Sequence, residues 1–347
     1  MADSQIFSQK PSDGDPWDII IIGSGPSAFT AAIYTTRGAA STLILGGEKW
    51  GGQLMLTTEV DNFPGHPGVQ GPDLMQKMRD HALLFGGELI EKNVESVDFS
   101  KHPFSLIADG ITYRAKSVIV ATGADTKWLG VPGEDKLRGR GVSSCAPCDA
   151  PFFKDKKVIV AGGGDSAMEE ALVLTKYASS VTVIHRRDEF KASHAMQTKV
   201  LNHEKIDIVW DTEIVEIEGD TSVSGLKLKT NPESKHLAEI KDTVIPKHEA
   251  TITSESEGIN WTMPADGLFV AIGHSPSTDI FKGTIELDQK GYVAKHTRDG
   301  YDMSTSVDGV FVAGDVHDYH YRQAITAAGF GCKAGMDTLR YLEEKKD

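Results

Sequence analysis

The chain has 347 residues, enough for about two domains that each bury a hydrophobic core. Its 36 Lys and Arg residues against 50 Asp and Glu residues give a formal net charge of −14. This excess of acid argues against binding to nucleic acid or to an anionic membrane surface, because both attract basic patches.

The N-terminus lacks the cationic start and apolar stretch of a signal peptide, and apolar runs such as residues 19–22 are too short to span a bilayer. Three cysteines, Cys145, Cys148 and Cys332, are too few for a secreted disulfide framework. We therefore expect a cytosolic protein with no membrane segment.

Residues 1–16 are polar and predict a flexible N-terminal arm. A buried strand is expected over Trp17–Ile22, followed by a glycine-rich turn at residues 23–28, a helix to Arg37 and a strand over Thr42–Leu45. Strands that are continuously apolar are buried on both faces, which is typical of a parallel sheet covered by helices.

The same order of elements recurs in the middle of the chain. A strand is predicted over residues 157–161, a glycine-rich turn over 162–167, a helix through 171–178 and a strand over 180–184. The recurrence indicates duplication of a nucleotide-binding module rather than a short-period repeat.

Other segments follow from the same reading. We expect buried strands ending in small-residue turns over residues 117–124, 267–273 and 310–316. Residues 229–263 predict a polar meander with a surface extension, and residues 323–342 predict a C-terminal helix. The predicted fold is α/β, with two three-layer, Rossmann-like dinucleotide-binding domains.

The second domain is expected as an insertion in the first. Residues 17–126 and 265–347 form the first domain and residues 127–264 the second, with chain crossings near residues 124–127 and 264–267.

Each glycine turn opens a helix directly after a buried strand, which is the context that dinucleotide binding requires. The first glycine makes the tight turn, the second lets a pyrophosphate approach the backbone, and the helix N-terminus supplies partial positive charge. The alternative is an ordinary tight turn of an α/β protein; two copies favour nucleotide binding.

The residues after each copy distinguish two nucleotides. Glu48 follows the second strand of the first copy, where an acid can bind ribose hydroxyls. His185, Arg186 and Arg187 stand at the equivalent place after the second copy, and guanidinium groups suit the 2′-phosphate of NADPH. A solvated basic turn is the alternative for this second site.

Cys145 and Cys148 form a C-x-x-C motif at an expected helix start, a spacing that allows one disulfide and can depress a thiol pKa. Asp149 could move the proton that thiol–disulfide exchange requires. The alternatives are half of a zinc site, although no second ligand pair lies close by, and two inert buried thiols. Cys332 is expected to be a packed core thiol.

Two nucleotide sites and a dithiol together indicate electron transfer. NADPH carries two electrons as hydride, a disulfide accepts two, and a flavin mediates between them. On this chemical ground we expect FAD at the first site and NADPH at the second.

These motifs resemble those of the low-molecular-weight thioredoxin reductases, from about Trp17 to Leu342. The matching stretches are, in order, residues 23–28, 51–54, 58–65, 121–124, 145–149, 162–167, 185–188, 271–276, 314–316 and 321–324. The resemblance implies a homodimer that reduces thioredoxin or a thioredoxin-like protein.

The resemblance also implies which residues bind the cofactors. For FAD these are Gly23, Ser24, Gly25, Pro26, Ser27, Glu48, Gly52, Gln53, Asn62, Thr122, Gly123, Gly314, Asp315, Arg322, Gln323 and Ala324. For NADPH they are Gly162, Gly164, Asp165, Ser166, His185, Arg186, Arg187, Lys191 and Gly273; no metal site is expected.

Two positions depart from the family pattern. Lys191 stands where the family usually has arginine, and Pro151 falls where one aromatic residue that docks the partner is expected. The second departure leaves the identity of the partner open.

The positions of the motifs suggest motion. The dithiol and the second glycine turn lie in the same inserted domain, and both must reach one flavin, so we expect that domain to rotate on the two crossings. Two other functions remain open for the chain. One is a related flavoprotein with another electron donor or acceptor, linked to ferredoxin or a peroxidase, and the other is a redox sensor without catalysis.

Overall fold

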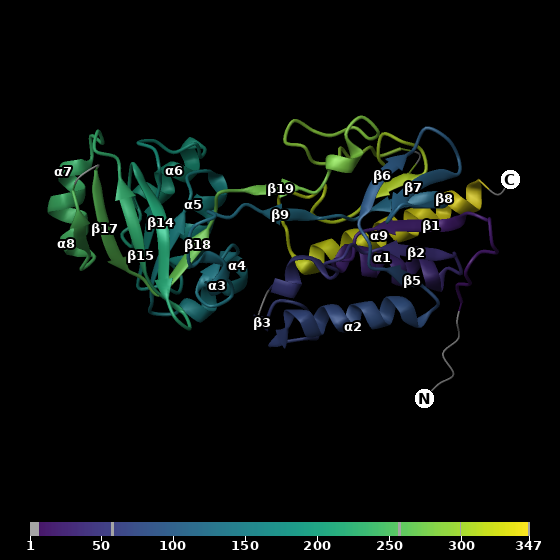
Figure 1. The fold of residues 1–347 in the computed structure, drawn as a ribbon, viewed down its shortest axis with the longest axis horizontal. Coiled ribbons are helices and arrows are strands. Elements are labelled where there is room, and N and C mark those ends of the chain that lie inside the picture. The colour runs from purple at the N-terminus through teal and green to yellow at the C-terminus, as the bar shows by residue number, and fades with distance from the viewer. Residues whose placement is uncertain (1–6, 57–58, 256–257, 299, 346–347) are drawn as a thin grey trace. The chain divides into compact units, whose positions relative to one another are not determined.

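The computed structural model describes residues 7–56, 59–255, 258–298 and 300–345, and the chain forms two compact units (Figure 1). The first unit comprises residues 1–125 and 275–347, and the second comprises residues 126–274. The second unit thus interrupts the first.

The first crossing lies within one residue of its expected position, whereas the second follows His274 rather than residues 264–267. The reason is that the strand Gly267–Val270 pairs with Lys157–Ala161 inside the second unit.

The first unit is built on a sheet of order β5-β2-β1-β8-β7-β6, in which β20 also pairs with β8. The pairings among β5, β2, β1, β8 and β20 are parallel, and β6, β7 and β8 form an antiparallel meander. The bounds are β1 (Trp17–Ile22), β2 (Thr42–Leu45), β5 (Glu88–Ile90), β6 (Val94–Asp98), β7 (Phe104–Ala108), β8 (Ile111–Val120) and β20 (Val310–Val312). The predicted strands over residues 17–22 and 42–45 are confirmed.

Three longer helices cover this sheet: α1 (Pro26–Arg37), α2 (Gly71–Leu84) and α9 (Ala324–Glu344). Helices α1 and α9 pack closely because small residues face each other; a Cβ added to Gly331 would lie 2.1 Å from the carbonyl oxygen of Ser27. The short elements are η1 (Gly52–Leu56), β3 (Glu59–Val60), β4 (Val69–Gln70) and η4 (Asp279–Phe281).

The second unit contains a parallel sheet of order β10-β18-β11-β12-β13. Its strands are β10 (Val142–Ser143), β18 (Gly267–Val270), β11 (Lys157–Ala161), β12 (Ser180–Ile184) and β13 (Ile206–Val209). The accompanying helices are α3 (Glu134–Leu137), α4 (Ala146–Asp149), η2 (Ala150–Phe153), α5 (Asp165–Leu174) and α6 (His194–Leu201). Helix α5 starts directly at the glycine turn and ends four residues before the predicted end at Ala178.

The second unit also has an antiparallel sheet of order β14-β15-β17-β16. Its strands are β14 (Thr212–Gly219), β15 (Val223–Thr230), β16 (Thr251–Ser254) and β17 (Ile259–Pro264). Between β15 and β16 the expected surface extension is helical, with α7 (Leu237–Glu239), a π-helical turn η3 (Ile240–Val244) and α8 (Ile245–Lys247). The buried Trp261 anchors this sheet, and its Nε1 donates to Thr230 Oγ1 at 3.0 Å.

The two crossings are strands that pair with each other, β9 (Ala124–Thr126) and β19 (His274–Pro276). Just beyond them, the Lys127 N–H donates to the Gly273 carbonyl oxygen at 3.0 Å.

The described part of the N-terminal arm contacts the first unit. Ser8 is buried and donates to the Ala40 carbonyl oxygen at 2.8 Å, and the ring of Phe7 lies 5.7 Å from that of Phe85. These contacts dock the arm on the first unit; residues 1–6 lie outside the described residues.

Cys332 is not the packed core thiol that the sequence predicts, since it is only partly buried on α9. Gly331, Ala334, Gly335 and Thr338 occupy the buried face of α9 at helical spacing, which leaves Cys332 at its margin. No described helix is both long and apolar enough to cross a membrane.

Candidate active site

The first glycine turn joins β1 to α1, and two of its glycines, Gly23 and Gly25, have different surroundings. Gly23 has φ +119°, and a Cβ there would lie 2.1 Å from the Ala121 carbonyl oxygen, so only glycine fits. A Cβ on Gly25 would meet nothing within 4 Å, which leaves open space at the N-terminus of α1. This opening is where a phosphate can approach the helix.

Parallel pairing brings the carboxyl ends of β1, β2, β8 and β20 to one edge of the sheet. Ser24 is buried there, where its Oγ donates to the Gly46 carbonyl oxygen at 2.5 Å and accepts from the Gly51 N–H at 3.0 Å. Thr122 Oγ1 donates to the Ser277 carbonyl oxygen at 2.8 Å. Several of the predicted FAD residues therefore meet at this edge.

Glu48 and Gln53 lie on exposed segments of the same unit. The Glu48 N–H donates to Asn93 Oδ1 at 3.2 Å, and Gln53 Nε2 donates to Asp125 Oδ1 at 2.9 Å. These bonds fix the backbone of Glu48 and the side chain of Gln53. A Cβ added to Gly52 would lie 3.4 Å from Gly25 Cα, so this segment borders the glycine turn.

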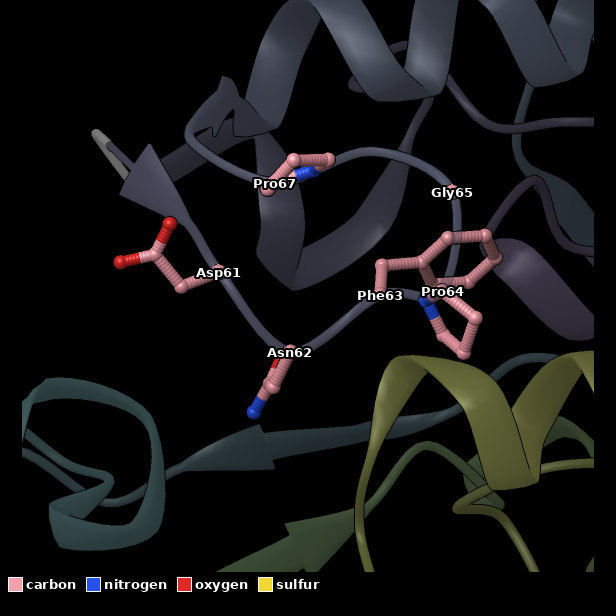
Figure 2. Close-up of a pocket in the computed structure, with 6 residues that line it drawn as sticks. All are labelled: Asp61, Asn62, Phe63, Pro64, Gly65 and Pro67. Carbon is pink, nitrogen blue, oxygen red and sulfur yellow. The ribbon is translucent and has the colours of Figure 1, made fainter.

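A loop of the first unit lines a surface pocket with Asp61, Asn62, Phe63, Pro64, Gly65 and Pro67. Figure 2 shows the amide end of Asn62 pointing away from the loop backbone. Its Nδ2 donates to Gln323 Oε1 at 3.2 Å, although the two residues are 261 positions apart. The structure thus brings together two of the predicted FAD residues from opposite ends of the chain.

The entrance to α9 is shaped by Asp318. Its carboxylate accepts the N–H groups of His320, Tyr321 and Arg322 at 3.0–3.4 Å, and Arg322 takes the left-handed conformation with φ +47°. Gln323 then caps α9, which begins at Ala324.

Asp315 follows β20 at the same edge, and its Oδ1 is buried with no hydrogen-bond partner among the described residues. Burial, with the nearby Asp318 carboxylate, raises the pKa of Asp315 to about 7. A buried oxygen of this kind requires a donor, and a ligand hydroxyl is one. With the open space at Gly25 and Gly123, the residues present fit a flavin dinucleotide.

The second glycine turn joins β11 to α5. A Cβ on Gly163 would lie 2.2 Å from the His185 ring, whereas Gly164 and Gly273 face open space. Asp165 accepts from both the backbone N–H and the Oγ of Ser193 at 2.8 Å, so its carboxylate ties the turn to the segment before α6. Ser166, one residue on, is partly exposed.

The basic residues after β12 divide into one buried and three exposed side chains. The His185 ring packs 5.5 Å from Phe190, and burial lowers its pKa, so it supports Gly163 as a neutral ring. Arg186, Arg187 and Lys191 are exposed, and within the described residues no carboxylate lies within salt-bridge distance of any of them. These three cations fit the 2′-phosphate of NADPH.

One lysine near this site was not predicted. Lys235, in the segment before α7, forms an ion pair of 2.8 Å with Asp188. The pair neutralises the acid that follows Arg186 and Arg187 in sequence. Sequence analysis found no role for this segment, because the pairing depends on how residues 231–236 fold against the chain around Asp211 and Asp188.

The C-x-x-C motif follows the carboxyl end of β10. Cys145 and Cys148 form a disulfide with their Cα atoms 5.3 Å apart, which confirms the predicted pair. Cys145 is the N-cap of α4, and its N–H donates to Ser143 Oγ at 3.1 Å. Burial raises the pKa of Asp149, and a hydrogen bond to Ser143 opposes that shift. This carboxyl is therefore suited to hold and release a proton closer to neutral pH.

The dithiol and the second glycine turn lie at the same sheet edge, because β10, β18 and β11 are parallel neighbours. A direct contact joins them: the Ala146 N–H donates to Glu170 Oε2 at 2.9 Å. Glu170 also escaped the sequence analysis. Its position four residues after Ser166 places both on one face of α5, but the packing of α4 against that face is not encoded in the motif.

Comparison with known proteins agrees with this geometry. The family model for pyridine nucleotide-disulphide oxidoreductase matches residues 17–331. The thioredoxin reductase of Mycolicibacterium smegmatis is 46% identical over 329 residues, which is 94% of this chain and 97% of that protein. The thioredoxin reductase of Streptomyces coelicolor is 46% identical over 96% of each chain.

A solved structure of thioredoxin reductase from Giardia duodenalis superposes with a TM-score of 0.82 at 40% identity and covers 94% of this chain and 99% of that one. The expected fold of two Rossmann-like domains and the resemblance found in the sequence are confirmed. The chain therefore belongs to the pyridine nucleotide-disulphide oxidoreductase family and, within it, to the flavoprotein thioredoxin reductases.

Proposed function

We propose that this chain transfers electrons from NADPH, by way of FAD, to the Cys145–Cys148 disulfide, and from the reduced pair to thioredoxin or a thioredoxin-like protein. The observation that carries the proposal is the disulfide at the same sheet edge as a nucleotide turn, followed by three exposed cations that pair with no carboxylate among the described residues. It joins an electron acceptor and a site for an electron donor in one unit.

The first unit would hold FAD through the residues at the carboxyl edge of its sheet. The backbone around Gly23, Ser24, Gly25, Pro26 and Ser27 would bind the pyrophosphate, and Glu48 the ribose. Asp315 would accept from a hydroxyl of the cofactor. Gly52, Gln53, Asn62, Thr122, Gly123, Gly314, Arg322, Gln323 and Ala324 would complete the site. When bound, FAD accepts two electrons as hydride and releases them to a disulfide.

The second unit would hold NADPH along α5 and β12. Gly162, Gly164, Asp165, Ser166 and Gly273 surround the turn, and Arg186, Arg187 and Lys191 would bind the 2′-phosphate. The Lys235–Asp188 ion pair supports this assignment, because it neutralises the acid that directly follows the two arginines. His185 would act indirectly, as the ring beneath Gly163.

The dithiol chemistry belongs to the chain itself. Two electrons and two protons convert the Cys145–Cys148 disulfide to two thiols. One of them, as a thiolate, attacks the partner's disulfide, and the other then closes the Cys145–Cys148 bond and releases the partner as a dithiol. Asp149 would move the protons, since burial raises the pKa of its carboxyl.

Rotation of the second unit would alternate these half-reactions. This unit carries both the NADPH residues and the dithiol, and both must reach the same flavin in turn. The chain passes between the two units at β9 and β19, so a rigid-body rotation on this two-stranded ribbon would exchange the NADPH residues and the dithiol at the flavin.

We also propose that the protein is a homodimer and that it is cytosolic. The resemblance implies a homodimer, and the exposed Tyr34, Ile325 and Met336 on α1 and α9 provide apolar surface for one. The acidic composition and low cysteine count favour the cytosol.

Anaerobic titration with NADPH tests the proposal. We expect the flavin absorbance near about 450 nm to bleach in the wild type and in Cys145→Ser and Cys148→Ser variants, because neither substitution removes a proposed cofactor contact. Reduction of thioredoxin should be lost in both variants. Wild-type protein that does not bleach with NADPH would indicate another electron donor or a redox sensor.

A further inference from the structure

The first backbone N–H of α4 belongs to Ala146, the residue between Cys145 and Pro147 in the C-x-x-C motif. Cys145 is the N-cap of this helix and Ala146 its first residue. In C-x-x-C motifs, amides at the helix start commonly stabilise the thiolate of the reduced form and so lower its pKa. Here the Ala146 N–H instead donates to the carboxylate of Glu170, at 2.9 Å.

The contact is fixed by packing between two helices of one unit. Glu170 lies on α5, is partly buried, and reaches an amide next to Cys145 in the chain. A hydrogen bond to an ionised acceptor is stronger than one between neutral groups, and partial burial strengthens it further. The preceding Glu169 carries the same charge but is exposed, which makes it a matched reference.

We propose that Glu170 is a positioning residue that makes the Cys145–Cys148 pair more strongly reducing. Its carboxylate takes up one amide at the start of α4, next to Cys145 in the chain, and its negative charge opposes formation of a thiolate in this motif. The two-electron, two-proton reduction of the disulfide yields two thiols, and loss of one proton yields the thiolate. Because Glu170 makes that thiolate less stable, the reduced pair gives up its electrons more readily. The inference rests on the proposed redox role of the disulfide.

The test measures the midpoint potential of the dithiol in the flavin-loaded, full-length protein, equilibrated in dithiothreitol redox buffers and scored by the mass of alkylated cysteines. Glu170→Gln keeps an acceptor for the Ala146 N–H but removes the charge, whereas Glu170→Ala removes both. We expect the potential to rise from wild type to Glu170→Gln to Glu170→Ala. A tenfold change in the equilibrium constant for Glu170→Ala corresponds to about 30 mV.

Alkylation of the reduced pair by iodoacetamide at pH 7 provides a second readout. Its rate should increase in the same order, because a larger thiolate fraction reacts faster. The control Glu169→Gln, which removes the same charge one residue away, should shift the potential by less than half the Glu170→Gln value. Equal potentials in wild type and both Glu170 variants would overturn the proposal, as would equal shifts in Glu169→Gln and Glu170→Gln.

The experiment still tests the proposal if one variant misfolds. Should Glu170→Ala be unstable, the nearly isosteric Glu170→Gln and its Glu169→Gln control decide the question alone. Failure of the proposed function looks different: the wild-type flavin would not be bleached by NADPH, yet the order of dithiol potentials would hold.

Discussion

The buried Asp315 makes stability of the flavin-free protein depend on pH in a predictable direction. Its folded pKa of about 7 lies above the value of about 3.9 expected in the unfolded chain. The folded state therefore binds this proton more tightly. Its stabilising contribution is complete below about pH 4 and is lost as the pH rises to about 7.

Substitution Asp315→Asn removes this titration. From the two pKa values, ionisation of Asp315 costs the wild type about 1.5 kcal/mol at pH 5 and about 4 kcal/mol at pH 8. The variant should therefore gain about 2.5 kcal/mol of unfolding free energy relative to wild type between these two pH values. Any constant cost of the buried amide cancels in that difference.

Urea denaturation of the flavin-free wild type and variant at pH 5 and pH 8 measures the effect. His317, whose pKa burial lowers to about 4, also makes stability depend on pH, but it does so in both wild type and variant and therefore cancels in their difference. A difference between variant and wild type that is the same at pH 5 and pH 8 would refute the reasoning about Asp315.

Three further predictions follow from other parts of the molecule. Gly331→Ala should cost at least about 2 kcal/mol of unfolding free energy, because its Cβ would meet a backbone carbonyl of α1 at 2.1 Å. The control Gly329→Ala, on the same helix, places a Cβ that meets nothing within 4 Å and should not destabilise the protein. Equal thermal unfolding of the two variants would contradict the packing argument. Lys235→Ala should weaken binding of 2′,5′-ADP by about threefold to tenfold, measured by calorimetry, while leaving binding of 5′-AMP unchanged. Adding Asp188→Asn to this variant should restore the binding of 2′,5′-ADP. No loss of binding on removing the lysine would exclude the ion pair from coenzyme selection. Asp149→Asn should slow thioredoxin reduction by about 10²-fold in stopped-flow assays without slowing flavin bleaching by NADPH, and an unchanged partner reaction would remove Asp149 from proton transfer.

The strands and glycine turns could be predicted from sequence because their signals are local. Trp17–Ile22, Thr42–Leu45 and Ser180–Ile184 are apolar runs bounded by turn residues, and each is a strand with those bounds. The turns were recognisable because Gly23 and Gly25 perform separable tasks at fixed spacing.

The second crossing could not be placed in this way. A buried apolar strand such as Gly267–Val270 suits the sheet of either unit, and only its pairing with Lys157–Ala161 assigns it to the second. The contacts of the N-terminal arm could not be predicted either, since the buried Ser8 donates to the carbonyl oxygen of Ala40, 32 residues away.

The site residues that escaped prediction share a physical reason. Glu170 and Lys235 are ordinary charged residues in sequence, and the role proposed for each depends on a contact with a segment that the local sequence pattern does not specify. The Cys145–Cys148 disulfide could be predicted because its motif is distinctive, and the arginines and Asp315 could be proposed as cofactor residues for the same reason.

The interruption of the first unit dictates an order of synthesis. Strand β20 and helix α9, which complete the first unit beside β8 and α1, leave the ribosome only after all of residues 126–274. The inserted unit is one continuous stretch, so it can fold while its host still lacks a strand and a covering helix. The unfinished host exposes the edge of β8 and the apolar face of α1 during that interval, and both are surfaces through which incomplete chains aggregate.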